Sequence, residues 1–388
     1  MSTNAFTSDP QDEGPERPTV RGALSLGVEE EYFVVDAQTH RLTDSGPLLD
    51  RVCRDGSEDY TAELRRCMIE SRTGICWSLT ELRADLRARR ETLISAAAGA
   101  GTTIVASGSY PPADWRREGF TSRPRFDHIA GAYARLADEH LVCACHVHVG
   151  VEGRDRAVEV VNRVRPWLPA LLALSASSPF WTGTDTGYAS YRSTLWARWP
   201  IAGMPPTLSS YAEHCDRVRR LVTSGTSADT GQVFWDVRPG TRFHTVEFRI
   251  ADSCTTVDEA VLQAGLSRAL VQRCLTEIAQ GDPAPEVPLE LLNAAKWRAA
   301  RFGLTGQLVD PVAAELVPAA ELVNRFLDHV RAPLTEAGDW AEIARLAHEV
   351  LSRGNGADRQ LRAFGHSGTV AAVVKQLIAE STTTDHRR

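Results

Sequence analysis

Three consecutive glutamates interrupt a segment that otherwise has the residues of a β-strand. Residues 27–36 read GVEEEYFVVD, and the aromatic and β-branched side chains after the glutamates favour a pleated, buried surface. Side chains alternate between the faces of a strand, so Glu29 and Glu31 share one face and Glu30 lies on the other. An edge strand that carries charge against aggregation is one interpretation. We favour a floor of oxygen ligands for a hard divalent metal ion, because neighbouring carboxylates repel one another without a cation between them.

Further acids and histidines could complete such a metal site. Glu63 and Glu70 are seven residues apart, which fits either one face of a helix or a loop ligand followed by a strand ligand. Residues 141–150, LVCACHVHVG, are expected to form a strand in which His146 and His148 share a face with small residues. That pair is either structural or in contact with metal or phosphate. The cysteines of this strand point to the opposite face, so we expect them in the core and not in a zinc cluster.

Acids alternate with arginines on the strands of a predicted hairpin. Residues 234–253 read as a strand, a Pro-Gly turn and a second strand. Glu247 and Arg249 share a face of the second strand, and Asp236 and Arg238 repeat this arrangement on the first. Either these are simple ion pairs, or the acid binds metal while the guanidinium binds phosphate or carboxylate.

A predicted substrate loop and the lack of a glycine-rich phosphate motif limit the ways in which the protein could bind its ligands. Residues 177–194 are rich in Gly, Ser, Thr and aromatic residues, with Arg192 near the end, and we expect a substrate loop here in preference to a linker. The sequence has no glycine-rich phosphate motif of the Walker or dinucleotide type. A nucleotide would therefore be held through metals and arginines, and acids, histidines and arginines on open strand faces suit phosphoryl transfer.

Helices and one more strand must position these groups. Ser78 and Glu81 form a capping-box pattern that begins a helix, whose arginines at positions 83–90 are expected on the solvated face. Similar caps predict helices that begin at Ser210 and Thr256. The remaining expected elements are a strand at 102–109, helices at 125–139, 155–177 (interrupted by prolines) and 291–301, and helical structure to about residue 379.

Composition limits the class of protein. The 388 residues are 43% hydrophobic and carry a formal net charge of −7, which gives no basic footprint for nucleic acid. The eight cysteines have no CxxC spacing, and the polar N-terminus lacks a secretion signal, so we expect a soluble cytoplasmic protein that does not enter a membrane. We expect a disordered tail at 1–22, one catalytic domain at 23–380 with a helical C-terminal part, and a flexible tail at 381–388.

Six segments occur in an order that resembles a known family. They are LGVEEEYFVV, the segment that ends in CMIE, CHVHVG, ALSASSPFWTGTDTGYASYR, WDVRP with TVEFRIAD, and KWRAARFGL. Together they resemble the carboxylate–amine ligases of the glutamate–cysteine ligase type 2 family over residues 24–306. The resemblance implies an α+β, glutamine-synthetase-like fold, in which a curved antiparallel sheet forms a funnel-shaped active site with helices packed outside.

The resemblance also implies a reaction. ATP phosphorylates a substrate carboxylate, and an amine captures the acyl phosphate to form an amide of the γ-glutamyl type, from glutamate and cysteine or another amine. The implied cofactors are ATP and Mg²⁺, with Mn²⁺ as a substitute, and the implied partners are small-molecule substrates. The sequence leaves open whether the chain forms a homo-oligomer. Arg65-Arg66 and Ser71-Arg72 depart from the usual residues around Glu70, which would alter how substrate carboxylates are held.

Matching positions supply the implied site residues. The metal ligands would be Glu29, Glu31, Glu63, Glu70, His146 and Glu247. The phosphate and substrate carboxylate would contact Arg249 and Arg192, and the nucleotide would contact Lys296, Arg301 and Arg238. His148, Tyr191, Trp235 and Arg192 are expected near the substrate. A metal-dependent hydrolase that uses the two strand histidines and a non-catalytic ligand-binding relative are the alternative functions.

Overall fold

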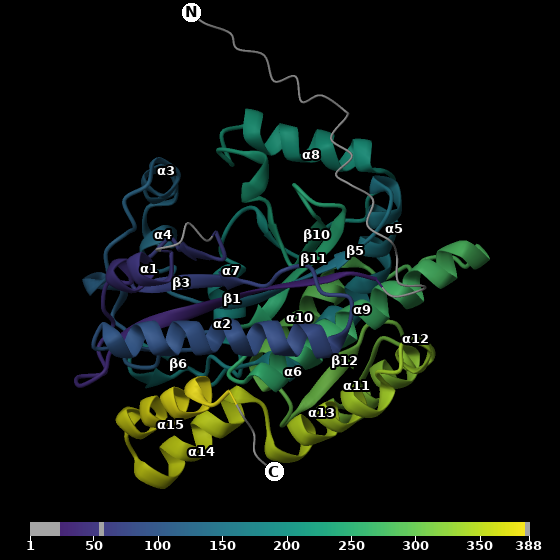
Figure 1. Ribbon diagram of the computed structural model, residues 1–388. Coiled ribbons are helices and arrows are strands. Elements are labelled where there is room, and N and C mark those ends of the chain that lie inside the picture. Colours follow the sequence, from purple (N-terminus) through teal and green to yellow (C-terminus); the bar gives the residue numbers. More distant parts are fainter. Residues whose placement is uncertain (1–23, 54–57, 385–388) are drawn as a thin grey trace, which may run out of the picture.

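An antiparallel sheet forms the centre of the computed structural model, which describes residues 24–53 and 58–384 (Figure 1). Within these residues the strand order is β10-β11-β5-β1-β3-β2, and β4 also pairs with β1. Each of these pairs is antiparallel. The strands are β1 (Leu26–Asp36), β2 (Tyr60–Ala62), β3 (Met68–Arg72), β4 (Thr102–Val105), β5 (Ala144–Gly150), β10 (Val237–Pro239) and β11 (Thr245–Asp252).

The glutamate segment forms the central strand β1, and its side chains alternate between the two faces as predicted. Its aromatic and β-branched run from Tyr32 to Val35 is fully buried, as expected of a strand inside a sheet. Glu29 and Glu31 lie on one face and line a cavity. Glu30 lies on the opposite face and is 1% exposed.

Glu30 binds an arginine that the sequence placed in solvent. Arg90 of α2 (Leu79–Gly99) donates to Glu30 from Nη2 to Oε1 at 2.5 Å and from Nε to Oε2 at 3.2 Å. Arg90 also donates to the carbonyl oxygens of Cys254 and Thr255 at 2.8 and 2.9 Å. The prediction that the arginines at 83–90 lie on the solvated face is wrong for Arg90, because a carboxylate and two carbonyls replace its water.

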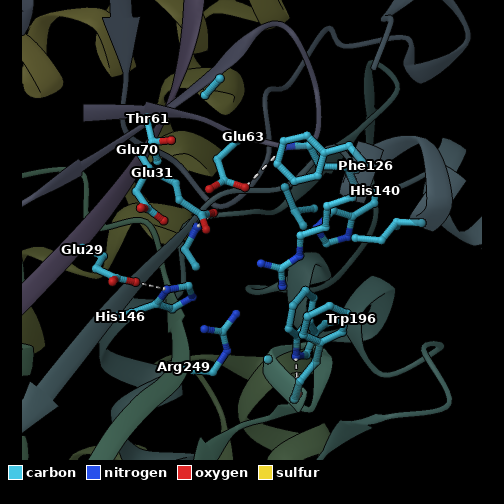
Figure 2. A pocket seen from close by; sticks show the side chains of 18 of the residues that line it. Glu29, Glu31, Thr61, Glu63, Glu70, Phe126, His140, His146, Trp196 and Arg249 are labelled. Carbon is cyan, nitrogen blue, oxygen red and sulfur yellow. Dashed lines mark hydrogen bonds and ion pairs between the residues drawn. The ribbon is translucent and has the colours of Figure 1, made fainter. Parts of the chain in front are cut away.

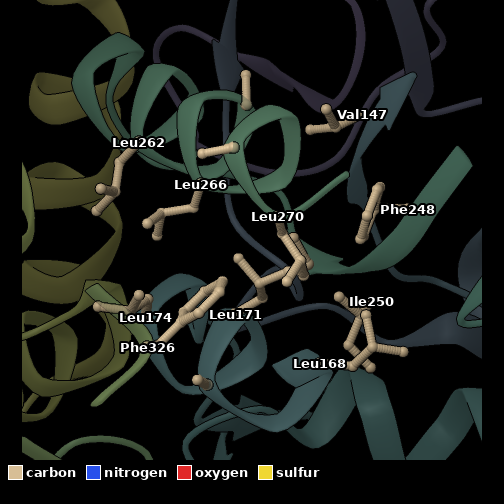
Figure 3. Packing of buried hydrophobic residues seen from close by; sticks show 14 of the residues in the cluster. Val147, Leu168, Leu171, Leu174, Phe248, Ile250, Leu262, Leu266, Leu270 and Phe326 are labelled. Carbon is tan, nitrogen blue, oxygen red and sulfur yellow. The ribbon is translucent and has the colours of Figure 1, made fainter. Parts of the chain in front are cut away.

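The apolar face of the sheet packs on three helices (Figure 3). Val147 of β5 and Phe248 and Ile250 of β11 are buried against leucines of α9 (Val257–Gln280) and α6 (Leu168–Ser175), and Phe326 of α11 (Ala319–His329) closes this core. Alternation along the strands therefore sends apolar residues to the helices and polar residues to the other face. Cys145 of β5 and Cys143, which precedes this strand, are both buried, so the two cysteines lie in the core as predicted.

The predicted helix starts are confirmed, and several predicted spans are divided. Ser78, Ser210 and Thr256 each accept a hydrogen bond at a helix N-terminus. The helix expected at 125–139 breaks at Ala134, whose φ of 45° lies in the left-handed region. The other helices are α1 (Gly46–Val52), α3 (Pro124–Tyr133), α4 (Arg135–Asp138), α5 (Arg154–Val164), α7 (Tyr191–Trp196), α8 (Tyr211–Thr223), α10 (Leu289–Phe302), α12 (Arg331–Glu336), α13 (Trp340–Arg353), α14 (Gly356–Ser367) and α15 (Val370–Thr382).

Short strand pairs were partly missed by the sequence analysis. The C-terminal part contains the hairpin of β12 (Gln307–Asp310) and β13 (Glu315–Pro318), where only helix was expected. The start of the predicted hairpin at 234–253 is a separate strand, β9 (Phe234–Trp235), which pairs in parallel with β8 (Ala202–Gly203). A further hairpin joins β6 (Phe180–Trp181) and β7 (Thr184–Asp185) within the predicted substrate loop.

Tails were expected at both ends of the chain. The tail expected at 1–22 lies outside the described residues. Helix α15 continues to Thr382, and Ser381 is fully buried; residues 385–388 of the tail expected at 381–388 lie outside the described residues. The C-terminal helices α11–α15 lie together on one side of the sheet, at the opposite end of the view from α8 (Figure 1).

Candidate active site

The polar face of the sheet lines a cavity of about 330 Å³. Its walls are the acids of β1 and β3, His146 of β5, three arginines from β10, β11 and α7, and a group of aromatic side chains (Figure 2). Pockets of this size that combine apolar walls with a few convergent charged groups are typical ligand sites.

Strand register brings the acids and histidines together. Glu29 is opposite His146 in the β1–β5 pair, and Glu31 is opposite Glu70 in the β1–β3 pair. Glu247 of β11 is opposite His148 of β5. Glu63 follows β2 in a loop, so the second of the two interpretations of the Glu63–Glu70 spacing is correct.

Three sets of side chains in the described residues have ligand atoms within 4.8 Å of one another. Each set could hold a metal ion. The sets are Glu31, Glu63 and Glu70; Glu29, Glu70 and His146; and Glu29, His148 and Glu247.

The carboxylates of the first set repel one another. Burial and Glu70 raise the pKa of Glu31 to about 7, and burial, Glu70 and Glu31 raise the pKa of Glu63 well above its ordinary value. Burial and Glu29 also raise the pKa of Glu70, although Arg72 opposes them through a 2.6 Å contact between Nε and Oε1. A site that resists ionisation in this way favours a bound cation.

Glu29 is held by the two histidines. Its Oε2 lies 3.2 Å from Nδ1 of His146, and its Oε1 lies 3.5 Å from Nε2 of His148. Burial raises the pKa of Glu29, but hydrogen bonds with both histidines outweigh it and lower the pKa well below its ordinary value. Burial and Arg249 lower the pKa of His146 to about 4, so its imidazole is neutral at pH 7 and suited to bind metal.

Glu247 lies between two arginines. Arg238 donates from Nε to Oε2 at 2.8 Å and from Nη2 to Oε1 at 3.2 Å, and Arg249 pairs with Oε1. Burial raises the pKa of Glu247, but Arg238 and Arg249 outweigh it and the pKa falls below its ordinary range. Glu247 is ion-paired, as the first alternative for this Glu-x-Arg pattern expects. It also belongs to a potential metal set, so metal binding by this acid stays a prediction.

Arg192 is fixed beneath the cavity by the end of β11. Its guanidinium donates to the carbonyl oxygens of Ile250 and Arg249 at 3.3 and 3.1 Å and lies 3.6 Å from Asp252. Asp252 in turn accepts hydrogen bonds from three serines of the predicted substrate loop, Ser177, Ser178 and Ser190.

Six expected site residues do not line the cavity. Two of them, Glu247 and His148, share a potential metal set with the lining residue Glu29. The other four belong to no such set. Lys296 is buried with its Nζ 2.6 Å from Asp236, which satisfies its charge away from the cavity, and Arg301 donates to the carbonyl of Gly187. Trp235 packs in a small core beside α8, and Tyr191 lies against Trp181 and Tyr188. The expected contacts of Lys296 and Arg301 with nucleotide, and of Trp235 and Tyr191 with substrate, gain no support from these positions.

Several lining residues were not anticipated. Arg72 was noted only as a departure from the family pattern, yet it binds Glu70; Arg65 and Arg66 point elsewhere, since Arg65 donates to Trp115 and Arg66 pairs with Asp44. The unanticipated lining residues are Thr61, Ala62, Leu64, Arg72, Arg123, Arg125, Phe126, Ile129, His140, Val142, Ala144, Trp196, Trp199, Gly231 and Phe234. No motif marks them, because they come from loops, helices and strands that only the fold brings together.

Comparisons with known proteins agree with this structure. The sequence model of Glutamate-cysteine ligase family 2 matches residues 25–376. A Frankia alni protein, provisionally named glutamate–cysteine ligase 2-2, is 40% identical over 380 residues, which cover 94% of this chain and 99% of that protein. A longer Rhodococcus jostii protein with a similar provisional name is 42% identical over 357 residues, which cover 92% of this chain and 45% of that protein.

A solved structure shares the fold. The glutamate–cysteine ligase of Francisella tularensis in complex with AMP superposes with a TM-score of 0.68 at 12% identity, covering 94% of this chain and 90% of that one.

The sheet and its layer of helices form a glutamine-synthetase-like fold around the charged cavity. The chain belongs to glutamate–cysteine ligase family 2. The expectations of this fold, this family and an ATP-dependent carbon–nitrogen ligase are thereby confirmed. Every helix in the described part of the chain is too short or too polar to cross a lipid bilayer.

Proposed function

We propose that the protein joins the carboxylate of an amino acid, glutamate, to an amine in a single domain that spans residues 23–380. The substrate carboxylate attacks the γ-phosphorus of ATP and gives an acyl phosphate and ADP. The amine nitrogen then attacks the acyl carbon, phosphate leaves with the C–O bonding electrons, and the nitrogen loses a proton to yield the amide. Cysteine is the amine in the names of the relatives.

One observation carries this proposal: a single cavity holds a cluster of carboxylates on one side and paired guanidiniums on another. Glu29, Glu31, Glu63 and Glu70 gather at the sheet, while Arg192 and Arg249 come from α7 and β11 (Figure 2). Phosphoryl transfer needs this combination, because catalysis consists mainly of positioning and of neutralising the charge on the transferred group.

The donor atoms fit a hard divalent cation. Carboxylate oxygens dominate the three sets, and the raised pKa values of Glu31 and Glu63 show that a cation would relieve their mutual repulsion. Glu29, Glu31, Glu63, Glu70, Glu247 and either strand histidine would hold Mg²⁺ or Mn²⁺. When bound, such ions neutralise phosphate oxygens and align the nucleotide with the attacking carboxylate.

The arginines have separate tasks in this proposal. Arg249 and Arg192 face the cavity and would bind the transferred phosphate or the substrate carboxylate through charge-assisted hydrogen bonds. Arg238 holds Glu247 and donates to the carbonyls of Gly231 and Val233, so it orients the wall of the cavity. An acyl phosphate hydrolyses readily, and an enclosed cavity limits the access of water to it.

Phosphate release from ATP tests the proposal. Purified protein with Mg²⁺ would be incubated with glutamate or another amino acid and a panel of amines, and the product mass would be read from the same samples. We expect release that requires both an acid and an amine, with a product lighter by one water than their sum. Glu63→Gln should reduce this rate at least about 100-fold, because it removes a charge from the metal set.

The same substitution at an exposed glutamate is the control, because it removes a charge outside the cavity. Glu152 is exposed, so Glu152→Gln should keep the wild-type rate. Folded, Mg²⁺-treated protein that turns over no ATP with any pair would contradict the proposal and favour a ligand-binding relative. The hydrolase alternative has little support, since each of the three metal sets in the described residues contains at most one histidine.

A further inference from the structure

The wall of the cavity that faces the carboxylates is built from rings and an aliphatic side chain. We call it the aromatic wall, and it consists of Phe126, Ile129, His140, Trp196, Trp199 and Phe234. Figure 2 shows Phe126, His140 and Trp196 across the opening from the acids of β1 and β3. Glu29, Glu31 and Glu70 lie on the other side, so we expect the two sides to receive different parts of the substrates.

The aromatic wall is already packed for binding. The ring of Trp199 meets Phe234 edge-on at 5.7 Å between centroids, and His140 lies 5.4 Å from Trp196 and 5.3 Å from Trp199. Trp196 also donates from Nε1 to the carbonyl oxygen of Phe234 at 3.0 Å. Rings that hold one another in this way form a rigid apolar surface that loses little entropy when a flat ligand binds.

The side chains of the aromatic wall carry few polar groups, although Arg123 and Arg125, which precede Phe126 in the chain, also line the cavity. Burial and Arg192 lower the pKa of His140 to about 3, so this imidazole is neutral at pH 7, and its Nδ1 has no hydrogen-bond partner among the described residues. The indole N–H of Trp196 is already used. The wall itself therefore offers mainly apolar surface, with the Nδ1 of His140 and the two neighbouring arginines as its polar contacts, which suits an apolar ring better than a base with a polar edge.

The arginines fix the direction in which the amine must lie. The guanidiniums of Arg192 and Arg249 lie 5.7 and 5.8 Å from the ring centroid of Trp196, so they stand beside the aromatic wall. Bond formation occurs at the carboxylate that these arginines would bind. An amine whose nitrogen reaches that point therefore extends its side chain along the aromatic wall.

We propose that the aromatic wall binds the side chain of the amine substrate, and that this side chain is an aromatic ring and not the thiol of cysteine. The inference rests on the proposed ligase function. A flat ring would cover the parts of Phe126, His140 and Phe234 that remain exposed at the cavity and would stack against the wall, whereas a small thiol would cover less of them.

A comparison of amines tests the preference. Rates of ATP-dependent amide formation would be measured with glutamate and with phenylethylamine, phenylalanine, alanine or cysteine as the amine. We expect kcat/KM for the better aromatic amine to exceed that for cysteine by at least about tenfold. A higher kcat/KM for cysteine or alanine would overturn the inference while leaving the ligase function intact.

Two phenylalanine variants locate the subsite. Phe126→Ala should raise KM for the aromatic amine at least about fivefold and leave KM for ATP and glutamate within about twofold. Phe120 packs in the same hydrophobic cluster as Phe126 but does not line the cavity. Phe120→Ala is therefore the control and should keep the wild-type KM values. An increase in KM for ATP alone would assign the wall to adenine and overturn the inference.

Calorimetry separates this inference from the ligase proposal. If no amine supports turnover, the ligase proposal is wrong. Titration of phenylethylamine into wild-type and Phe126→Ala protein still tests whether the aromatic wall binds an aromatic amine. Binding that weakens in the variant supports the aromatic subsite, and absence of binding to the wild type overturns it.

Discussion

Replacement of Glu31 by glutamine is expected to stabilise the metal-free protein at pH 8. Burial and Glu70 raise the pKa of Glu31 from 4.5 to about 7. A group whose pKa is raised by folding stabilises the fold below its unfolded pKa, and this stability is lost as the pH rises through the folded value. A pKa difference of about 2.5, at about 1.36 kcal/mol for each unit, corresponds to roughly 3 kcal/mol above pH 7.

Glutamine removes the charge and keeps the hydrogen bond. The backbone N–H of Ala144 donates to Oε2 of Glu31 at 2.7 Å, and the amide oxygen of glutamine can accept the same bond. Urea unfolding in the presence of a chelator would measure the effect. The free energy of unfolding of the variant should exceed that of the wild type by up to about 3 kcal/mol at pH 8 and by about 1 kcal/mol at pH 5. Saturating Mg²⁺ should stabilise the wild type more than the variant, because the variant lacks one carboxylate ligand.

The adjacent glutamate provides the control. Glu30→Gln is the same chemical change one residue away, but it leaves the buried guanidinium of Arg90 without its carboxylate. It should lower the free energy of unfolding by about 3 to 5 kcal/mol at both pH values. A Glu31→Gln protein that is no more stable than wild type at pH 8 would refute the argument from repulsion in the cluster.

Two other substitutions probe buried polar groups. Lys296→Met should lower the free energy of unfolding by about 3 to 5 kcal/mol because it leaves Asp236 buried without its cation, and a double variant with Asp236→Asn should recover part of this loss in urea unfolding. Gly108→Ala should lower the melting temperature and the activity, since its Cβ would lie 2.6 Å from the Asp252 carboxylate. Gly131→Ala, where a Cβ meets no atom within 4 Å, should melt near the wild-type temperature.

Period-two alternation explains why the acidic side of the site could be predicted. Once residues 27–36 and 141–150 are strands, Glu29 and Glu31 must share a face, and so must His146 and His148. The sequence did not show that β1 and β5 are neighbours, and only their register places Glu29 beside His146.

Tertiary contacts explain what could not be predicted. Arg90 has the local sequence of an exposed helix residue, and only the approach of β1 and of the turn after β11 buries it. Lys296 lies on a helix with other basic residues, and its partner Asp236 is 60 positions away. The aromatic wall combines α3, α7 and β9 with the loops beside them, so no periodicity in one segment could indicate it.

The two edges of the main sheet bear on how the protein behaves at high concentration. The strands at the two ends of the strand order, β2 and β10, are three residues long, and β10 ends at Pro239, which has no N–H to donate. Strand β4, which pairs with β1 outside this order, has four residues. An incoming strand from another copy would find few free backbone groups on either edge. This sheet is therefore poorly suited to grow by strand addition, the route by which many open sheets assemble into fibrils.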